Sequence, residues 1–272
     1  MTTLKFLFLG DIYGKPGCAM AEKWISQLVA KHAVQAVIVN TENSGNNGKG
    51  ISPKIAQMFK DLGVFALTTG NHVWAQRDIY QYIGENNFLL RPLNFPSSCP
   101  GKGIFIGEVA GHTVAIINAQ GRVFMREDLD CPFKAIDSAL TYVQTKTKLI
   151  FIDFHAEATS EKAALAYYLD GRVSGFFGTH THVQTADERI LPKGTAFMSD
   201  LGFSGALNSA LGAKSSVIIQ KFLTQMPHKF EVETTGPFVM SGLFVTVDTQ
   251  TGKALSVERL RIIDEQLSVA AE

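Results

Sequence analysis

The stretch Leu4-Lys5-Phe6-Leu7-Phe8-Leu9-Gly10-Asp11 decides the fold class. Its short, mostly apolar run stops at Gly-Asp, as a buried strand that runs into a loop does. After Pro16-Gly17, apolar residues at 20, 24, 25, 28 and 29 recur at helical spacing. Further apolar runs at 36–39 and 64–68 predict two more strands. This β-α-β-α-β opening predicts an α/β fold in which part of the sheet is parallel and helices cover its faces.

A second helix is predicted between the second and third strands. Ser52 is suited to the N-cap position, Pro53 to the first turn, and Gly63 to the C-terminal end. Farther along, helices are expected at 132–145 and 160–169. The remaining apolar runs predict strands at 104–109, 113–118, 149–154, 173–178, 243–247 and 256–262. Two sheets packed face to face between flanking helices would accommodate so many strands. Without any long linker, residues 1–272 are expected to form a single domain.

The composition narrows the class of protein. With 46% hydrophobic and 18% charged residues, the chain of 272 residues can bury a sizeable core. Lys plus Arg and Asp plus Glu number 25 each, so no global field favours long nucleic acid or an anionic membrane. Three widely spaced cysteines without a CxxC pattern indicate reduced thiols in a cytoplasmic protein. No apolar run is long enough to span a membrane.

Polar side chains with oxygen or nitrogen donors follow five of the predicted strands. They lie in Gly10-Asp11, Thr41-Glu42-Asn43, Gly70-Asn71-His72, Phe154-His155-Ala156-Glu157 and Gly178-Thr179-His180-Thr181-His182. Ligands of open α/β sheets bind beyond the carboxyl ends of the strands, so these loops can converge. Carboxylate, amide and imidazole donors without thiolate suit Fe, Mn or Zn.

Each segment alone also has a plain structural interpretation. Asp11 could form an Asx turn, Glu42-Asn43 a solvated loop, Gly70-Asn71-His72 a turn, and His155 a satisfied core position. His180 and His182 favour a metal more strongly, because alternation at the end of a strand would point both imidazoles to the same side. The occurrence of all five segments together favours the metal site.

The order Asp, acidic-Asn, Gly-Asn-His, His, Gly-x-His-x-His resembles that of the calcineurin-like metallophosphoesterases, and most closely their YmdB-like branch of bacterial phosphodiesterases. The resemblance runs from Leu4 to about Ile263. Its most specific stretches are Gly70-Asn71-His72-Val73-Trp74, Gln120-Gly121-Arg122-Val123-Phe124-Met125, Phe154-His155-Ala156-Glu157-Ala158-Thr159-Ser160-Glu161-Lys162 and Gly178-Thr179-His180-Thr181-His182-Val183-Gln184-Thr185-Ala186-Asp187.

The resemblance implies a four-layer α/β/β/α sandwich with two divalent or transition-metal ions, Fe or Mn before Zn. Matched by position, one set of metal ligands would be Asp11, Glu42, Asn43 and His182. The other set would be Glu42, Asn71, His155 and His180, with the Glu42 carboxylate shared by both ions. His72 would be the catalytic proton donor, although orienting Asn71 is an alternative role for it.

Some positions depart from related sequences. The wider superfamily usually has Asp-x-His at the first site, whereas Asp11-Ile12-Tyr13 has no histidine there, so Asn43 is expected to fill that place. Glu42 replaces the usual Asp; the YmdB-like branch shares both changes. Residues 202–206, Gly-Phe-Ser-Gly-Ala, replace the branch's Gly-Met-Thr-Gly-Pro in what we expect to be a loop walling the cleft.

The resemblance implies a phosphodiesterase that hydrolyses 2′,3′- or 3′,5′-cyclic nucleotides. Two bound cations neutralise an anionic ester and lower the pKa of a water, which makes hydroxide available at neutral pH. A phosphomonoesterase of small phosphorylated metabolites and a nucleotide-binding regulatory module with little turnover are the alternatives. The expected partner is a small-molecule phosphoester, and the apolar C-terminal strands are compatible with a homo-oligomer.

Overall fold

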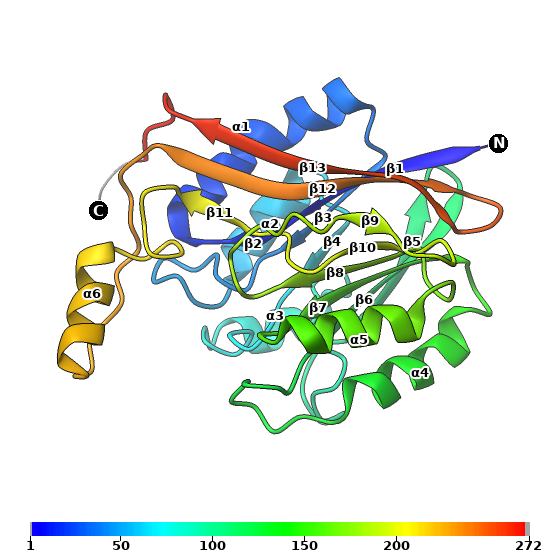
Figure 1. Ribbon diagram of the computed structural model, residues 1–272, viewed down its shortest axis with the longest axis horizontal. Helices are drawn as coiled ribbons and strands as arrows, with labels where there is room; N and C mark the ends of the chain where they lie inside the picture. The colour runs from blue at the N-terminus through cyan, green and yellow to red at the C-terminus, as the bar shows by residue number, and fades with distance from the viewer. Residues whose placement is uncertain (1, 270–272) are drawn as a thin grey trace.

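The computed structural model describes residues 2–269, which form two stacked sheets between helices (Figure 1). The first sheet has the order β2-β11-β12-β1-β3-β4, and β13 pairs with β12. Its strands are β1 (Thr3–Leu9), β2 (Asp11–Ile12), β3 (Ala36–Asn40), β4 (Ala66–Thr68), β11 (Phe203–Ala206), β12 (Phe238–Asp248) and β13 (Ala254–Asp264). Strands β1, β3 and β4 run parallel to one another, as the opening of the sequence predicts.

The second sheet has the order β5-β6-β7-β8-β10-β9. Its strands are β5 (Ile104–Val109), β6 (His112–Gln120), β7 (Leu149–His155), β8 (Gly175–Thr179), β9 (Arg189–Ile190) and β10 (Ala196–Met198). Strands β6, β7, β8 and β10 are parallel. Their carboxyl ends therefore meet at one edge of the sheet.

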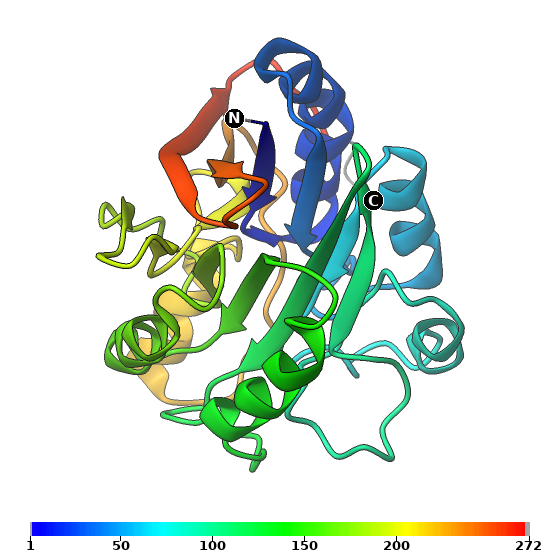
Figure 2. The ribbon, with the colours of Figure 1, turned by 90° about the vertical axis from the view of Figure 1, so that its right-hand side faces the viewer.

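The helices other than the last one lie on the two outer faces, and the last one projects at one end of the molecule (Figure 1). They are α1 (Gly14–His32), α2 (Pro53–Asp61), α3 (Ile79–Glu85), α4 (Pro132–Val143), α5 (Thr159–Leu169) and α6 (Ser215–Thr224). Residues of α1, α2 and α3 share a buried cluster with the first sheet, and residues of α4 and α5 share one with the second. Figure 2 shows α4 and α5, in green, on the opposite side of the molecule from α1, in blue.

Strand β1 shows how the layers arise from alternation. Leu7 and Leu9 belong to the cluster under the helices, whereas Phe6 and Phe8 belong to the cluster between the sheets. Successive side chains of a strand point to opposite faces, so a strand that is apolar on both faces must be covered on both. The four-layer α/β/β/α fold is thereby confirmed. Among the described residues, no helix is long and apolar enough to cross a membrane.

Several boundaries differ from the prediction. Helix α1 begins at Gly14, so Pro16 and Gly17 lie inside its first turn rather than before it. Residues 203–206 form strand β11, which pairs with β2 and β12, and the expected loop at 202–206 is therefore wrong. The predicted cap of α2 is confirmed, because the Ser52 hydroxyl accepts the Ile55 N–H at 3.4 Å.

Asp264, the last residue of β13, ties this strand to α1. Its Oδ2 accepts the indole N–H of Trp24 at 2.9 Å and pairs with the ammonium of Lys23. Its Oδ1 accepts the backbone N–H groups of Gln266 and Leu267 at 3.0 and 2.9 Å. Burial alone would raise the pKa of Asp264, but these donors outweigh it and lower the pKa to about 2.

We expect Asp264→Asn to lower the free energy of unfolding at neutral pH by about 1 kcal/mol, because hydrogen bonds to a charged group are weakened and solvent screens part of the ion pair. The folded-state pKa lies below the ordinary value of ~3.9. The stabilisation is therefore present above about pH 4 and lost as the pH falls toward about 2. Urea unfolding across this range measures it, with Glu265→Gln as a control that removes a neighbouring exposed charge. Equal stability of wild type and Asp264→Asn at neutral pH would contradict the assignment.

Candidate metal centre

The carboxyl ends of five strands bring the predicted donors together. Asp11 follows β1, Glu42 and Asn43 follow β3, and the segment 70–72 follows β4. In the facing sheet, His155 is the last residue of β7, and His180 and His182 follow β8. All seven predicted ligands and His72 are found at this one edge, and they form two connected groups.

The first group surrounds the Nε2 atom of His155. This nitrogen lies 3.1 Å from Glu42 Oε2, 3.1 Å from Asn71 Oδ1 and 3.0 Å from His180 Nδ1. The donor atoms of Glu42, His155 and His180 all lie within 4.8 Å of one another. These four residues are the predicted second set of ligands.

The second group surrounds the Nε2 atom of His182. It lies 3.1 Å from Asn43 Oδ1 and 3.8 Å from Asp11 Oδ1. Asp11 is fully buried, and its Oδ1 has no hydrogen-bond partner, although its Oδ2 accepts the His180 N–H at 3.1 Å. A buried carboxylate oxygen without a donor is costly unless a cation neutralises it. The donor set of this group therefore fits a metal ion.

Gly70 lets the strand ends approach one another. A Cβ atom at this position would lie 2.1 Å from His155 Cδ2 and 2.3 Å from Glu42 Oε2. Any other residue would therefore push apart the Glu42 carboxylate, which both predicted sets include, and the His155 imidazole of the second set. This close packing explains why the first residue of the Gly-Asn-His segment is a glycine.

The backbone at His180 and His182 differs from the predicted alternation. Strand β8 ends at Thr179, and the two histidines have positive φ angles of 99° and 63°. Their imidazoles therefore diverge: His180 faces His155, whereas His182 faces Asn43. The expectation that both point to the same side of a strand is wrong, because non-glycine residues in this strained conformation leave the strand geometry.

The ionisable side chains of the two groups shift one another's pKa values. Burial opposes ionisation of both Glu42 and His155, but their contact lowers the pKa of Glu42 and raises the pKa of His155. Burial also raises the pKa of Asp11. Burial and the neighbouring His155 lower the pKa of His180 to about 3, so its imidazole is neutral. A metal ion would displace the proton of His155, because imidazole binds metal in its neutral form.

Two buried carboxylates behind the donors were not anticipated from the sequence. Asp153 accepts hydrogen bonds from Asn40 Nδ2 at 2.9 Å and Thr179 Oγ1 at 2.7 Å. Thr179 Oγ1 in turn lies 2.9 Å from His155 Nδ1. This chain of contacts fixes the orientation of the His155 ring, as a carboxylate typically does behind a metal-binding imidazole. Alternation along the wholly buried β7 gave no signal for Asp153.

The second buried carboxylate, Asp200, holds the His180–His182 segment. Its Oδ2 lies 2.8 Å from the ammonium of Lys162, and accepts the Thr181 N–H at 3.1 Å and the Thr181 hydroxyl at 2.8 Å. Lys162 also donates to the Thr179 carbonyl at 2.9 Å. Lys162 is the last residue of the stretch 154–162, which resembles the YmdB-like branch, and this resemblance was the sequence signal for a role of Lys162.

Glu157 and two aromatic rings complete the surroundings. Glu157 Oε2 lies 3.1 Å from His180 Nε2, which leaves His180 Nδ1 facing the His155 group. The Phe203 ring stacks on His182 at 5.5 Å, and Tyr13 meets the same imidazole edge-on at 5.5 Å. Tyr13 therefore packs against a proposed ligand at the position where the wider superfamily has a histidine.

His72 lies against the Glu42 carboxylate, which both predicted ligand sets include. Its Nδ1 is 3.1 Å from Glu42 Oε1 and 3.3 Å from Asn43 Nδ2, and its backbone N–H donates to Glu42 Oε2 at 3.2 Å. Its side chain is partly exposed. Within the described chain, the hydrogen bonds of this ring go to Glu42 and Asn43 and not to Asn71, which disfavours the alternative role of orienting Asn71.

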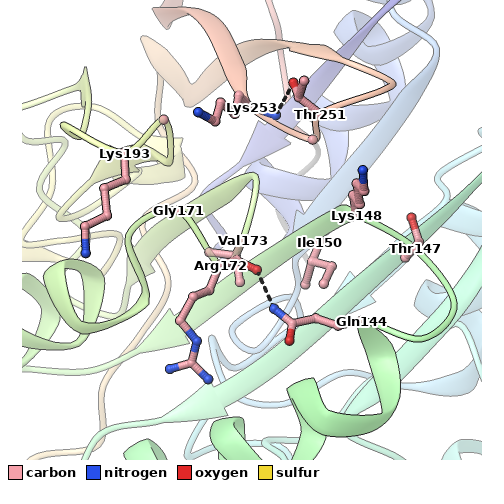
Figure 3. A pocket seen from close by; sticks show the side chains of 12 residues that line it. Gln144, Thr147, Lys148, Ile150, Gly171, Arg172, Val173, Lys193, Thr251 and Lys253 are labelled. Atoms are coloured by element: carbon pink, nitrogen blue, oxygen red, sulfur yellow. Dashed lines mark hydrogen bonds between the residues drawn. The ribbon is translucent and has the colours of Figure 1, made fainter.

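A separate hollow of about 400 Å³ lies at the other end of the second sheet. It is lined by the segments before β7 and β8 and by the turn between β12 and β13. Four cations line it: Lys148, Arg172, Lys193 and Lys253. Figure 3 shows these side chains pointing in different directions rather than toward one point. The hollow therefore has no convergent donors of the kind found at the carboxyl edge.

Comparisons with known proteins show the family to which the chain belongs. The family model described as "YmdB-like protein" matches residues 7–260. A 2′,3′-cyclic-nucleotide 2′-phosphodiesterase of Bacillus subtilis (strain 168) is 44% identical over 264 residues, which cover 97% of this chain and 99% of the relative.

Solved structures share the fold. A structure described as a novel phosphatase, from Mycoplasma pneumoniae, is 36% identical with a TM-score of 0.91 and covers 98% of this chain and 96% of its own. The NAD nucleotidase of Haemophilus influenzae is 13% identical with a TM-score of 0.61, over 96% of this chain and 56% of its own, and shows the fold alone. The predicted resemblance is confirmed, and the chain belongs to the YmdB-like protein family.

Proposed function

We propose that this protein is a metal-dependent phosphodiesterase that opens 2′,3′-cyclic nucleotides. The observation that carries the proposal is the gathering of seven oxygen and nitrogen donors into two groups, which contacts of His72 with Glu42 and Asn43 link. The Bacillus subtilis relative, named for this activity, supports the substrate class. Because the donors come from both sheets, the whole chain is proposed to work as one catalytic domain.

The two groups assign the ligands. Asp11, Asn43 and His182 would hold one metal ion, Asn71, His155 and His180 the other, and Glu42 both. Iron or manganese suits this oxygen- and nitrogen-rich set, and zinc is compatible with it. When bound, the ions would supply hydroxide at neutral pH and neutralise the phosphoryl oxygens.

The chain's own groups would position and protonate the reactants. His72 Nδ1 faces Glu42 and Asn43, so its Nε2 is the ring nitrogen available to a substrate. From there it would donate a proton to the departing ribose oxygen as the ester bond breaks. Asp153, through Thr179, and Glu157 would keep the imidazoles of His155 and His180 in position.

The purified protein is expected to contain about two Fe or Mn ions per chain, since seven donors with one shared carboxylate exceed the needs of a single ion. Elemental analysis measures the content. Chelation with EDTA should remove both metal and activity, and adding Mn²⁺ or Fe²⁺ should restore activity. Preparations that contain no metal and are not activated by either ion would contradict the proposed centre.

A substrate panel tests the reaction class. The protein should convert 2′,3′-cyclic AMP to adenosine monophosphate without releasing inorganic phosphate, and should act more slowly on 3′,5′-cyclic AMP. Release of phosphate from adenosine 3′-monophosphate as the faster reaction would instead identify a phosphomonoesterase. Binding without turnover of any of these compounds would identify a regulatory module.

A further inference from the structure

The segment between β6 and α4 leaves the second sheet beside the proposed metal centre. Gln120, the last residue of β6, pairs with His155 in the parallel register. The next residue, Gly121, donates its N–H to the His155 carbonyl at 3.0 Å. Figure 1 shows this green segment at the same end of the molecule as α6. The start of this segment therefore lies beside His155, one of the proposed metal ligands.

Both ends of this segment are fastened. The Asn94 amide donates to the carbonyls of Gln120 at 2.8 Å and Asp130 at 2.9 Å, and its Oδ1 accepts the Gln120 N–H at 3.0 Å. Beyond Gly121, the Glu161 carboxylate accepts the backbone N–H groups of Arg122 at 3.0 Å and Val123 at 3.3 Å. The backbone immediately before Phe124 is thus held in place.

Phe124 itself is presented outward at an energetic cost. Its side chain is 85% exposed, and its φ angle is +62°. A bulky residue rarely adopts this left-handed conformation, and an exposed aromatic ring forgoes the free energy of burial. Contacts within the chain therefore do not account for an aromatic ring at this position. A ligand that covers the ring would.

We propose that Phe124 is a platform on which the nucleobase of the substrate stacks. The inference rests on the proposed function and adds a base-binding subsite to it. Phe124 is the third residue after Gly121, so its backbone lies within roughly 11 Å of that of Gly121, whose N–H is bonded to the His155 carbonyl. An aromatic face binds any base, because every base has a π-face. The exposed Arg122 beside it adds a cation that favours an anionic nucleotide.

The proposal is tested by comparing substrates with and without a base. Phe124→Ala should raise KM for 2′,3′-cyclic AMP about 5- to 100-fold, the range expected when one base–aromatic stack is lost. Its kcat/KM for the 2,3-cyclic phosphate of methyl riboside, which has no base, should stay unchanged. Phe124→Trp should retain the low KM. Tyr142→Ala is the matched control, since it removes an exposed aromatic ring from α4.

Equal losses on both substrates, or no loss on either, would overturn the base-binding role. So would a change in sedimentation of Phe124→Ala with an unaltered KM, which would assign the ring to a contact between copies of the chain.

A binding measurement keeps the test independent of turnover. In Phe124→Trp, adenosine 3′-monophosphate should quench the added indole, measured against wild type, which contains only Trp24 and Trp74. Ribose 5-phosphate should not quench it. Quenching without hydrolysis would refute the proposed function and support the subsite, whereas hydrolysis without quenching would refute the subsite alone.

Discussion

Glu42→Gln should abolish turnover of 2′,3′-cyclic AMP, with a loss on the order of 1,000-fold or more. The substitution keeps the size and one oxygen of the side chain but removes the negative charge. Glu42 Oε2 lies 3.1 Å from His155 Nε2, and Oε1 lies 3.1 Å from His72 Nδ1. His72 Nδ1 also lies 3.3 Å from Asn43 Nδ2, so Glu42 contacts the first group of donors and is linked through His72 to the second. A neutral amide cannot bridge two cations as a carboxylate does, and both metals should be lost together.

Metal content and activity are measured on the same preparation. Elemental analysis should show less than one ion per chain in Glu42→Gln, while circular dichroism shows the wild-type fold. Glu258→Gln serves as the control, because it makes the same chemical change at an exposed position of β13. Full metal occupancy in Glu42→Gln would remove Glu42 from its proposed bridging position.

The layers of the fold could be predicted because their signal is local. Strand β1 carries apolar residues on both faces, and this requires a covering layer on each side of the sheet. Helix α6 gave no such signal: none of its residues is buried, and Phe222 and Leu223 are 70% and 74% exposed. Strands β2 and β11 are short, and they pair with each other although nearly two hundred residues separate them in the sequence.

The donors of the site could be predicted because they follow strands, whereas the residues that position them could not. His180 and His182 were found through their spacing, yet strand alternation was the wrong reason, since both have positive φ angles. Lys162 and Asp200 are 38 residues apart and meet only in the folded chain. A buried lysine on a helix has no sequence period that distinguishes it from an exposed one. Tertiary contacts of this kind need the structure.

Kinetic measurements should distinguish the role of His72 in proton donation from the role of Asn71 in binding metal. Asn71→Ala removes an oxygen that lies 3.1 Å from His155 Nε2, so metal content and activity should fall together. His72→Ala should leave both metals bound and remove the proton donor to the leaving oxygen. The loss for 2′,3′-cyclic AMP should then lie mostly in kcat, on the order of 100-fold or more.

The leaving group distinguishes proton donation from positioning. A p-nitrophenyl ester departs as a stable phenolate and needs little protonation, so the defect of His72→Ala should shrink on that substrate. Both substrates are measured with the same variant, and this comparison cancels any loss of folded or metal-loaded protein. His72 also lies 3.1 Å from Glu42, and a positioning role through that carboxylate would slow both reactions equally. Equal defects would therefore assign His72 to holding Glu42 in place and leave the departing oxygen to be protonated by another group.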